Sequence, residues 1–201
     1  MFRMSLELEP SVFVHERALC ETDSIGPRTR VWAFAHLMPG AVIGADCNIC
    51  DHVFVETGAV IGDRVIVKNN ALIWARVTVA DEVFVGPNVV FTNDRAPRVA
   101  FPTPADEWLA TTVGRGATIG ANATIVCGVS LGEQCFVGAG SVIVDDVPAY
   151  ALMVGNPGRR IAWVCACSER LREDLRCACG RCYRLVNERS GLVPVEAVES
   201  R

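Results

Sequence analysis

The most regular feature of the sequence is a six-residue spacing of large apolar positions. Every sixth residue from Phe13 to Phe91 is Val, Ile, Leu or Phe, and the same spacing returns from Val113 to Ile143. A helix favours a period of 3.6 and an ordinary strand a period of two, so neither accounts for a period of six. Short strands rich in Val and Ile, separated by turns at equal intervals, do account for it. The pattern therefore predicts an all-β solenoid of hexads.

Small or β-branched residues stand two positions before many of these large residues. They are Thr29, Ala35, Ala41, Cys47, Val53, Ala59, Val65 and Ala71, then Ala117, Ala123, Val129, Cys135 and Ser141. Alternating large and small inward side chains fill a narrow interior without voids. Three hexads make a triangular coil, and parallel strands stack the coils about 4.8 Å apart. The run of hexads predicts a parallel β-helix of roughly six to seven coils.

The hexad pattern breaks once, between Phe91 and Val113. The segment 92–112 is rich in proline and has no periodicity. A long loop inside a regular solenoid is usually functional or disordered. Phe101 and Trp108 suggest that this loop docks on another surface, such as a neighbouring subunit.

Composition and charge exclude several classes of function. The chain is 51% hydrophobic with a formal charge of −4, which gives no electrostatic reason to expect a nucleic-acid partner. No apolar run is long enough to span a bilayer, and residues 1–10 carry Arg3, Glu7 and Glu9 in place of a signal peptide. We expect a soluble, cytoplasmic protein with no membrane partner. No phosphate-binding or dinucleotide loop motif is present.

Several stretches resemble a known family more closely than hexads alone do. They are VWAFAH at 31–36, CDHVFVE at 50–56, VGPNVVFTND at 85–94, RGATIGANATIVCGVSLG at 115–132 and VPAYALMVGNPGRRIAWV at 147–164. Over about residues 12–163 the chain resembles the hexapeptide-repeat acyltransferases. Within them it is most similar to N-acetyltransferases that act on amino groups of nucleotide-linked sugars, of the UDP- or dTDP-3-amino-sugar type. The FTND and GANATI segments are the narrowest signals.

The resemblance implies a left-handed parallel β-helix over residues 12–160, a homotrimer, and acetyl-CoA bound in a groove between two subunits. An N-terminal extension would cover residues 1–11, and a cysteine-rich tail residues 161–201. The implied cofactor-binding residues lie in the later coils: Cys127, Gly128, Ala139, Gly140, Asn156, Pro157, Arg159 and Arg160. Two adjacent arginines suit the CoA phosphates, which prefer a fork of donors. For the glycines, corner geometry alone is an equally good explanation.

Four polar residues are candidates for the chemistry itself. His36 and His52 are expected to face outward, where a histidine near an intersubunit groove can deprotonate the attacking amine. Each can equally be a solvated surface residue, and an amino-sugar amine needs no protein base if positioning is sufficient. Asn93 can donate to the thioester oxygen, and Asp94 can orient the amine. The alternative for this pair is an Asx turn that opens the loop.

Further polar residues in successive coils are candidates for the sugar site. They are Glu56, Asn69, Asn70, Trp74, Asn88 and, in the loop, Arg98. As exposed turn residues they need no function.

The tail contains five of the ten cysteines within residues 165–182. Two near-copies, Cys165-Ala-Cys167 and Cys177-Ala-Cys179, offer four thiolates that suit a tetrahedral structural zinc, although the C-x-C spacing departs from the common C-x₂-C. If the two pairs are equivalent, Cys182 is the expected non-ligand; otherwise Cys182 can also serve as a ligand. Reduced cysteines without metal are the other alternative. Four thiolates leave no open position, so this zinc would not catalyse. The scattered cysteines are expected to act as small buried residues.

Two other functions remain open. One is an O-acetyltransferase of the same fold, which depends more strictly on a histidine base. The other is a non-catalytic β-helix scaffold, which would not bind CoA. A metal lyase would need three histidines on one zinc, and His15, His36 and His52 are expected in different coils.

Overall fold

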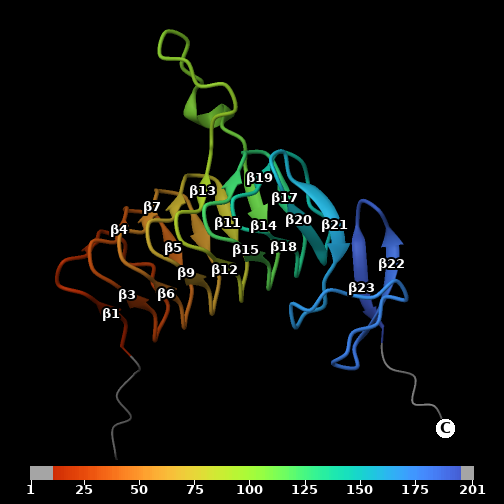
Figure 1. Ribbon diagram of the computed structural model, residues 1–201. Coiled ribbons are helices and arrows are strands. Elements are labelled where there is room, and N and C mark those ends of the chain that lie inside the picture. Colours follow the sequence, from red (N-terminus) through yellow and green to blue (C-terminus); the bar gives the residue numbers. More distant parts are fainter. Residues whose placement is uncertain (1–10, 196–201) are drawn as a thin grey trace, which may run out of the picture.

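A computed structural model describes residues 11–195, which wind into a parallel β-helix that carries a small β-ribbon at its C-terminal end (Figure 1). The parallel β-helix expected from the hexads is confirmed. Of the N-terminal extension expected for residues 1–11, only Ser11 lies within the described residues. Among the described residues, no helix has the length and apolar character that crossing a membrane requires.

Three sheets form the sides of the helix, and the chain passes from one to the next at each corner. Sheet A contains β1 (Phe13–Val14), β3 (Arg30–Val31), β6 (Asn48–Ile49), β9 (Ile66–Val67), β12 (Phe84–Val85), β15 (Thr118–Ile119), β18 (Phe136–Val137), β20 (Ala151–Val154) and the antiparallel β21 (Arg159–Trp163). Sheet B contains β2 (Leu19–Cys20), β4 (His36–Leu37), β7 (Phe54–Val55), β10 (Leu72–Ile73), β13 (Val90–Phe91), β16 (Thr124–Ile125) and β19 (Val142–Ile143). Sheet C contains β5 (Val42–Ile43), β8 (Val60–Ile61), β11 (Val77–Val79), β14 (Thr111–Val113) and β17 (Ser130–Leu131).

The second residue of most two-residue strands points inward, and the first points outward. Leu37, Ile49 and Val67 are completely buried, whereas the outward residue Val42 is 42% exposed. The small residues two positions earlier, such as Ala35, are buried with them. The continuous apolar column that results is the main source of stability, because each coil buries its inward side chains against the coils on either side.

The first coil departs from the predicted phase. Val14 pairs with Val31 and Cys20 with Leu37, so this coil has one residue fewer than the regular spacing. Phe13 and Leu19, which the hexad pattern predicts to face inward, therefore face outward and are 44% and 53% exposed. The short interval lies between Cys20 and Ile25, which are five residues apart instead of six. In this interval, buried Thr22 donates a hydrogen bond of 2.7 Å to the Ala41 carbonyl.

The helix is also longer than the hexads indicate. Sheet A has eight parallel strands, more than the six to seven coils expected, because the chain continues to coil after the strict spacing ends. Val147 pairs with Leu131, and Met153 with Val137, each after sixteen residues. The boundary expected at residue 160 falls inside β21, which still belongs to sheet A.

The interruption of the hexads is a loop that projects from the corner between sheets B and C (Figure 1). β13 ends at Phe91 and β14 begins at Thr111, so the inserted loop is residues 92–110 and ends two residues earlier than predicted. It contains one turn of 3-10 helix, η1 (Ala105–Glu107). The coils above and below remain in register, since Phe91 pairs with Ile125 and Val79 with Val113.

The β-ribbon of β22 (Cys182–Asn187) and β23 (Gly191–Val195) covers the C-terminal end of the helix. Leu192 donates its backbone N–H to the Ala149 carbonyl at 3.2 Å, and the rings of Tyr150 and Tyr183 lie 5.0 Å apart. A second apolar cluster joins these residues to the tail. Because terminal repeats of a solenoid expose their core and backbone, this ribbon acts as a cap.

Candidate active site and metal centre

Most of the candidate residues lie along two corners that border sheet B. The A–B corner connects each sheet A strand to the following sheet B strand, and the B–C corner connects sheet B to sheet C. The A–B corner carries His52, Asn69, Asn70, Asn88, Ala139 and Gly140, and the B–C corner carries Glu56, Trp74, Asn93, Asp94, Cys127 and Gly128. The outer face of sheet B lies between these two rows.

His36 lies on the outer face of sheet B, as expected from its position in the hexad. Its Nε2 is 2.8 Å from Oε2 of Glu21, and its ring meets Phe54 edge-on at 5.4 Å. Glu21 was not among the expected residues, because only the coil geometry brings it beside a histidine fifteen positions later. A carboxylate on one imidazole nitrogen fixes the ring and leaves the other nitrogen to a ligand.

His52 also faces outward, but at the A–B corner. It has a φ of 59°, and its ring stacks on Phe34 at 4.9 Å with an interplanar angle of 12°. The guanidinium of Arg17 lies over the Phe34 ring, 6.0 Å from its centroid. His52 is therefore an exposed corner residue held by stacking, and no carboxylate within the described chain pairs with it.

Asn93 and Asp94 open the inserted loop. The Asn93 carbonyl accepts a hydrogen bond of 3.2 Å from the Leu109 N–H, which closes the base of the loop. Asp94 Oδ1 accepts one of 2.9 Å from the Ala96 N–H, so this residue forms the Asx turn that the sequence left as an alternative. Both residues line a small cavity of about 220 Å³ with Trp108. The Asn93 side-chain amide has no partner among the described residues.

Arg76 anchors the loop and was missed in the sequence. Its Nη1 donates to the carbonyl of Asp106 at 3.0 Å and also to that of Trp108. Arg76 occupies the B–C corner one coil before the insertion. In the sequence, only this position next to the loop could have indicated that Arg76 contacts it. The loop is thus held against the helix at its base and free at its tip, where Val99 and Phe101 are 104% and 81% exposed.

The catalytic candidates do not meet within one protomer. His36 is on β4 and Asn93 follows β13, which lies three strands further along sheet B. At the usual strand spacing, the two residues are separated by about 14 Å along the helix axis. His52 lies at a different corner from Asn93. A single reacting atom therefore contacts His36 and Asn93 together only if they come from different protomers.

Two of the candidates for the sugar site, Glu56 and Trp74, lie at the B–C corner in successive coils. Glu56 Oε2 accepts a hydrogen bond of 2.7 Å from the Ala75 N–H. Trp74 packs on Phe54, with ring centroids 5.2 Å apart, so it extends the aromatic surface that begins at His36. Arg98 is exposed near the loop tip.

The asparagines of the A–B corner have structural partners. Asn70 donates to Asn88 at 3.2 Å and Asn88 to Asn122 at 3.1 Å, which makes a ladder of side-chain amides along the corner. All three have φ near 60°, a conformation that asparagine tolerates better than most residues. Asn69 donates to Asp51 at 3.2 Å. Corner geometry therefore explains these residue types without a ligand.

The expected cofactor residues fall into two environments. Cys127 is completely buried, with its N–H bonded to Thr92 Oγ1 at 2.9 Å, so its side chain has no surface to offer. Gly128 has a φ of 85°, and a Cβ there would lie 3.0 Å from Leu109 Cδ1, so it makes room for the loop. Ala139 and Gly140 are exposed, and a Cβ on Gly140 would meet nothing within 4 Å.

The segment from Asn156 to Arg160 turns between β20 and β21 at the C-terminal end of the helix. Asn156 and Pro157 are exposed in the turn. Arg159 donates only to the adjacent Gly158 carbonyl, at 3.0 Å. Arg160 lies over the Trp163 ring, 4.1 Å from the centroid, and pairs with Glu188 of the ribbon. A ligand phosphate would therefore compete with Glu188 for Arg160, but not for Arg159.

The four cysteines predicted as ligands meet in one cluster. The sulfur atoms of Cys165, Cys167, Cys177 and Cys179 all lie within 4.8 Å of one another. Zinc–sulfur bonds of about 2.3 Å in a tetrahedron place sulfur atoms about 3.8 Å apart, so the donor set fits zinc. Cys182 points instead toward the Gly180 carbonyl, at 3.8 Å, and lies outside the cluster as expected.

Hydrogen bonds around the cluster lower the pKa of two of the four cysteines, Cys165 and Cys179, whereas the pKa values of Cys167 and Cys177 are raised. The Arg181 backbone N–H, together with its guanidinium 3.3 Å from the sulfur, lowers the pKa of Cys179 to about 6. The Tyr183 hydroxyl lies 3.1 Å from the Cys165 sulfur and accepts the Ala166 N–H at 3.0 Å. Thiolates are the metal-binding form of cysteine.

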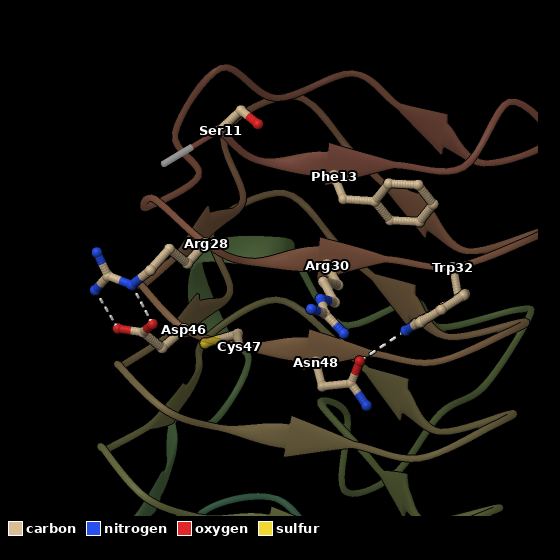
Figure 2. A pocket seen from close by; sticks show the side chains of 8 residues that line it. All are labelled: Ser11, Phe13, Arg28, Arg30, Trp32, Asp46, Cys47 and Asn48. Carbon is tan, nitrogen blue, oxygen red and sulfur yellow. Dashed lines mark hydrogen bonds and ion pairs between the residues drawn. The ribbon is translucent and has the colours of Figure 1, made fainter. Parts of the chain in front are cut away.

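A groove at the N-terminal end of sheet A was also missed (Figure 2). It has a volume of about 810 Å³. Its lining residues are Ser11, Phe13, Arg28, Arg30, Trp32, Asp46, Cys47 and Asn48. The phase error in the first coil hid it, because Phe13 was expected in the core.

Comparison with known proteins agrees with the hexad coils. The family model for bacterial transferase hexapeptide (six repeats) matches residues 24–57 and 110–145, on either side of the inserted loop. The chain is 48% identical over 175 residues to the dTDP-3-amino-3,6-dideoxy-alpha-D-galactopyranose 3-N-acetyltransferase of Aneurinibacillus thermoaerophilus. That match covers 86% of this chain and 90% of the relative.

Two solved structures share the fold at low identity. One is a point mutant of AntD, an N-acyltransferase from Bacillus cereus, in complex with dTDP and coenzyme A. Its TM-score is 0.57 at 17% identity, with 77% of this chain and 84% of that chain covered. The other is a point mutant of the GDP-perosamine N-acetyltransferase of Caulobacter crescentus in complex with CoA and GDP-perosamine, with a TM-score of 0.54 and 21% identity. It matches 76% of this chain, which spans only 57% of that one. On the near-complete match at 48% identity, the chain belongs to the hexapeptide-repeat acyltransferases.

Proposed function

We propose that the protein is an N-acetyltransferase that moves an acetyl group from acetyl-CoA to the amino group of a nucleotide-linked amino sugar. The observation that carries this function is the 48% identity, over 86% of the chain, to an enzyme that acetylates the 3-amino group of a dTDP-linked sugar. The fold shared with AntD and with the perosamine enzyme supports the same reaction class.

The reaction needs an uncharged amine and a stabilised oxyanion. The sugar nitrogen attacks the thioester carbonyl, a tetrahedral intermediate forms, and the carbon–sulfur bond breaks to release the thiolate of CoA. The nitrogen loses one proton, and the thiolate regains one to leave as CoA-SH. His36, oriented by Glu21, is the general base best supported by the geometry, because Glu21 occupies only one of its two ring nitrogens.

Asn93 is the candidate donor to the oxyanion. Its side-chain amide lines the small cavity of the inserted loop and has no competing partner among the described residues. An amide that makes no other hydrogen bond can donate to the charge that develops in the transition state. Asp94 is already used by its Asx turn, so its role is to hold the loop backbone.

The assembly we propose is a homotrimer with the acetyl-transfer site between subunits. His36 and Asn93 lie about three strands apart in one protomer, so both reach one reaction only across an interface. The tip of the loop presents Val99 and Phe101 to solvent, as a segment that docks on a neighbour would. Such a head-to-tail contact uses two different surfaces of each chain and closes into a ring.

The C-terminal coils are the proposed CoA site. Gly140 leaves its corner open to close backbone approach, and Arg159 has a guanidinium without an ion pair in the described chain. Arg160 joins it when a phosphate displaces Glu188. Arginine suits phosphate because its fork of donors matches the oxygen geometry.

The zinc site that we propose in the tail has a structural role and takes no part in acetyl transfer. Cys165, Cys167, Cys177 and Cys179 hold one zinc ion, which ties the tail to the last coil. Four thiolates fill a tetrahedral site, so the ion leaves no position for a substrate. Its contribution is to fix the cap.

Thiol release from acetyl-CoA tests the function directly. Purified protein is assayed with dTDP- and UDP-linked sugars that carry a 3-amino or a 4-amino group, and with matched sugars that carry only hydroxyl groups. We expect turnover with an amino sugar and none with its hydroxyl counterpart. Turnover with the hydroxyl sugars alone would make the enzyme an O-acetyltransferase. Absence of both turnover and CoA binding would leave a scaffold.

A further inference from the structure

The groove at the N-terminal end of sheet A contributes nothing to the acetyl-transfer step described above. Its walls come from three successive strands, β1, β3 and β6, and from the corners beside them (Figure 2). We propose that this groove binds the nucleoside diphosphate part of the sugar nucleotide. The proposal rests on the proposed function and names where its acceptor is held.

Arg30 supplies the charge that a diphosphate needs. It is the outward residue of β3, in register with Phe13 on one side and Asn48 on the other. Its guanidinium makes no ion pair within residues 11–195. The neighbouring Arg28 is neutralised by Asp46, through two hydrogen bonds of 2.5 Å. The groove therefore offers one uncommitted guanidinium, the group that recognises phosphate oxygens best.

Phe13 and Trp32 supply a surface for a base. Their rings lie 5.4 Å apart at 58°, and Phe13 is 44% exposed. Trp32 Nε1 donates to Asn48 Oδ1 at 2.7 Å, which fixes the indole ring and the amide. Aromatic rings beside a positive groove are the usual means of holding a nucleotide, since every base has a π-face.

The volume and position of the groove suit this ligand. A volume of about 810 Å³ is in the range of small-molecule sites, which span roughly 300–1,000 Å³. The proposed CoA residues follow β18 and β20, at least five strands of sheet A beyond β3, or about 24 Å along the helix. Acceptor and donor nucleotides would thus occupy opposite ends of the helix, with the sheet B candidates between them.

The aromatic side chains continue from the groove toward those candidates. Trp32 begins the A–B corner, where Phe34 stacks on His52 at 4.9 Å. His36 and Phe54 follow on sheet B, 5.4 Å apart. A sugar attached to a diphosphate at Arg30 would extend over this surface, and aromatic rings suit the apolar faces of sugars.

The test measures binding of thymidine diphosphate to the full-length protein by calorimetry. We expect Arg30→Gln to weaken binding roughly 10- to 100-fold, because a hydrogen bond to a charged group is lost. Arg184→Gln on the ribbon is the matched control and should bind as the wild type does. Phe13→Ala should weaken binding of thymidine diphosphate about fivefold or more and leave inorganic pyrophosphate unaffected. Acetyl-CoA binding should be unchanged in every variant.

Kinetics separates this site from the proposed function. With an amino-sugar acceptor, Arg30→Gln should raise KM for the sugar nucleotide by the same factor and leave kcat close to the wild-type value. Wild-type binding of thymidine diphosphate by Arg30→Gln would overturn the proposal, as would a loss of acetyl-CoA binding. A wild-type protein that binds the nucleotide through Arg30 but transfers no acetyl group would refute the proposed function and leave the nucleotide site standing.

Discussion

The Nε2 atom of His36 lies 2.8 Å from the Oε2 atom of Glu21 on the outer face of sheet B. Both side chains are about one-third to two-fifths exposed, at 34% and 42%. At this exposure the pair adds little to the stability of the fold, because water screens its charges. Its effect is geometric, since it holds the imidazole ring by one nitrogen and leaves the other nitrogen free of Glu21.

The first prediction concerns this pair. His36→Ala should lower kcat roughly 10²- to 10⁴-fold, the usual worth of a general base, with little change in the melting temperature. Glu21→Gln should lower kcat less, because the ring remains but its orientation is lost. His15→Ala, a change in an adjacent coil, is the control. If both His36→Ala and His52→Ala turn over at near-normal rates, neither of these two histidines acts as the base.

The second prediction concerns Asn93. Asn93→Ala should lower kcat roughly 10²- to 10³-fold if its amide donates to the oxyanion. KM for acetyl-CoA should change little, because that contact forms only in the transition state. Normal turnover by Asn93→Ala would remove this assignment. Asp94→Asn keeps the side-chain acceptor of the turn and should retain most activity.

The third prediction concerns the loop tip. Wild-type protein should sediment as a trimer, and the double change Val99→Ser with Phe101→Ser should shift it toward monomer and reduce turnover. Both side chains are fully or largely exposed in the protomer, so their loss should not disturb its fold. Sedimentation equilibrium and circular dichroism measure the two effects separately. A double variant that remains a trimer would show that the tip does not hold the subunits together.

The coils could be predicted from the sequence because their inward positions repeat at a fixed interval. The first coil could not, since Phe13 and Val14 are both apolar, as are Leu19 and Cys20. The six-residue pattern therefore fits equally well with either residue of each pair pointing inward. Only the backbone pairing of the first coil with the next shows that Val14 and Cys20 occupy the inward register.

The candidate site could be predicted only where it does not depend on how neighbouring coils align. The four clustered cysteines lie close together in the chain, so their spacing alone indicated a cluster. The contact of His36 with Glu21 depends on how two coils align, and a hexad pattern does not specify which outward side chains reach each other. The groove around Arg30 is lined by Phe13, which the phase error placed inside.

The fourth prediction concerns the asparagine ladder. Asn88 has a φ of 58° and hydrogen bonds to Asn70 and Asn122. Asn88→Val should lower the free energy of unfolding by about 2 kcal/mol, because a β-branched residue is strained in the left-handed region. Asn88→Gly should cost less, since glycine adopts this φ freely. Chemical denaturation measures both. Equal losses would mean that the side-chain amides, rather than the backbone, hold this corner.

The fifth prediction concerns the metal. Purified protein should contain about one zinc per chain by elemental analysis. Cys177→Ser should lose the metal and lower the melting temperature, because the zinc links the tail to Tyr150 of the last coil through the cluster around Cys165.

Cys182→Ser is the matched control for that experiment. It removes a thiol from the same tail but from outside the cluster, so it should keep both zinc and melting temperature. Turnover measured at a temperature where both variants stay folded should be similar, because the zinc has no open position. Loss of zinc from Cys182→Ser would mean that the fifth cysteine is a ligand. A chelator that abolishes turnover without unfolding the protein would mean that the metal does more than hold the cap.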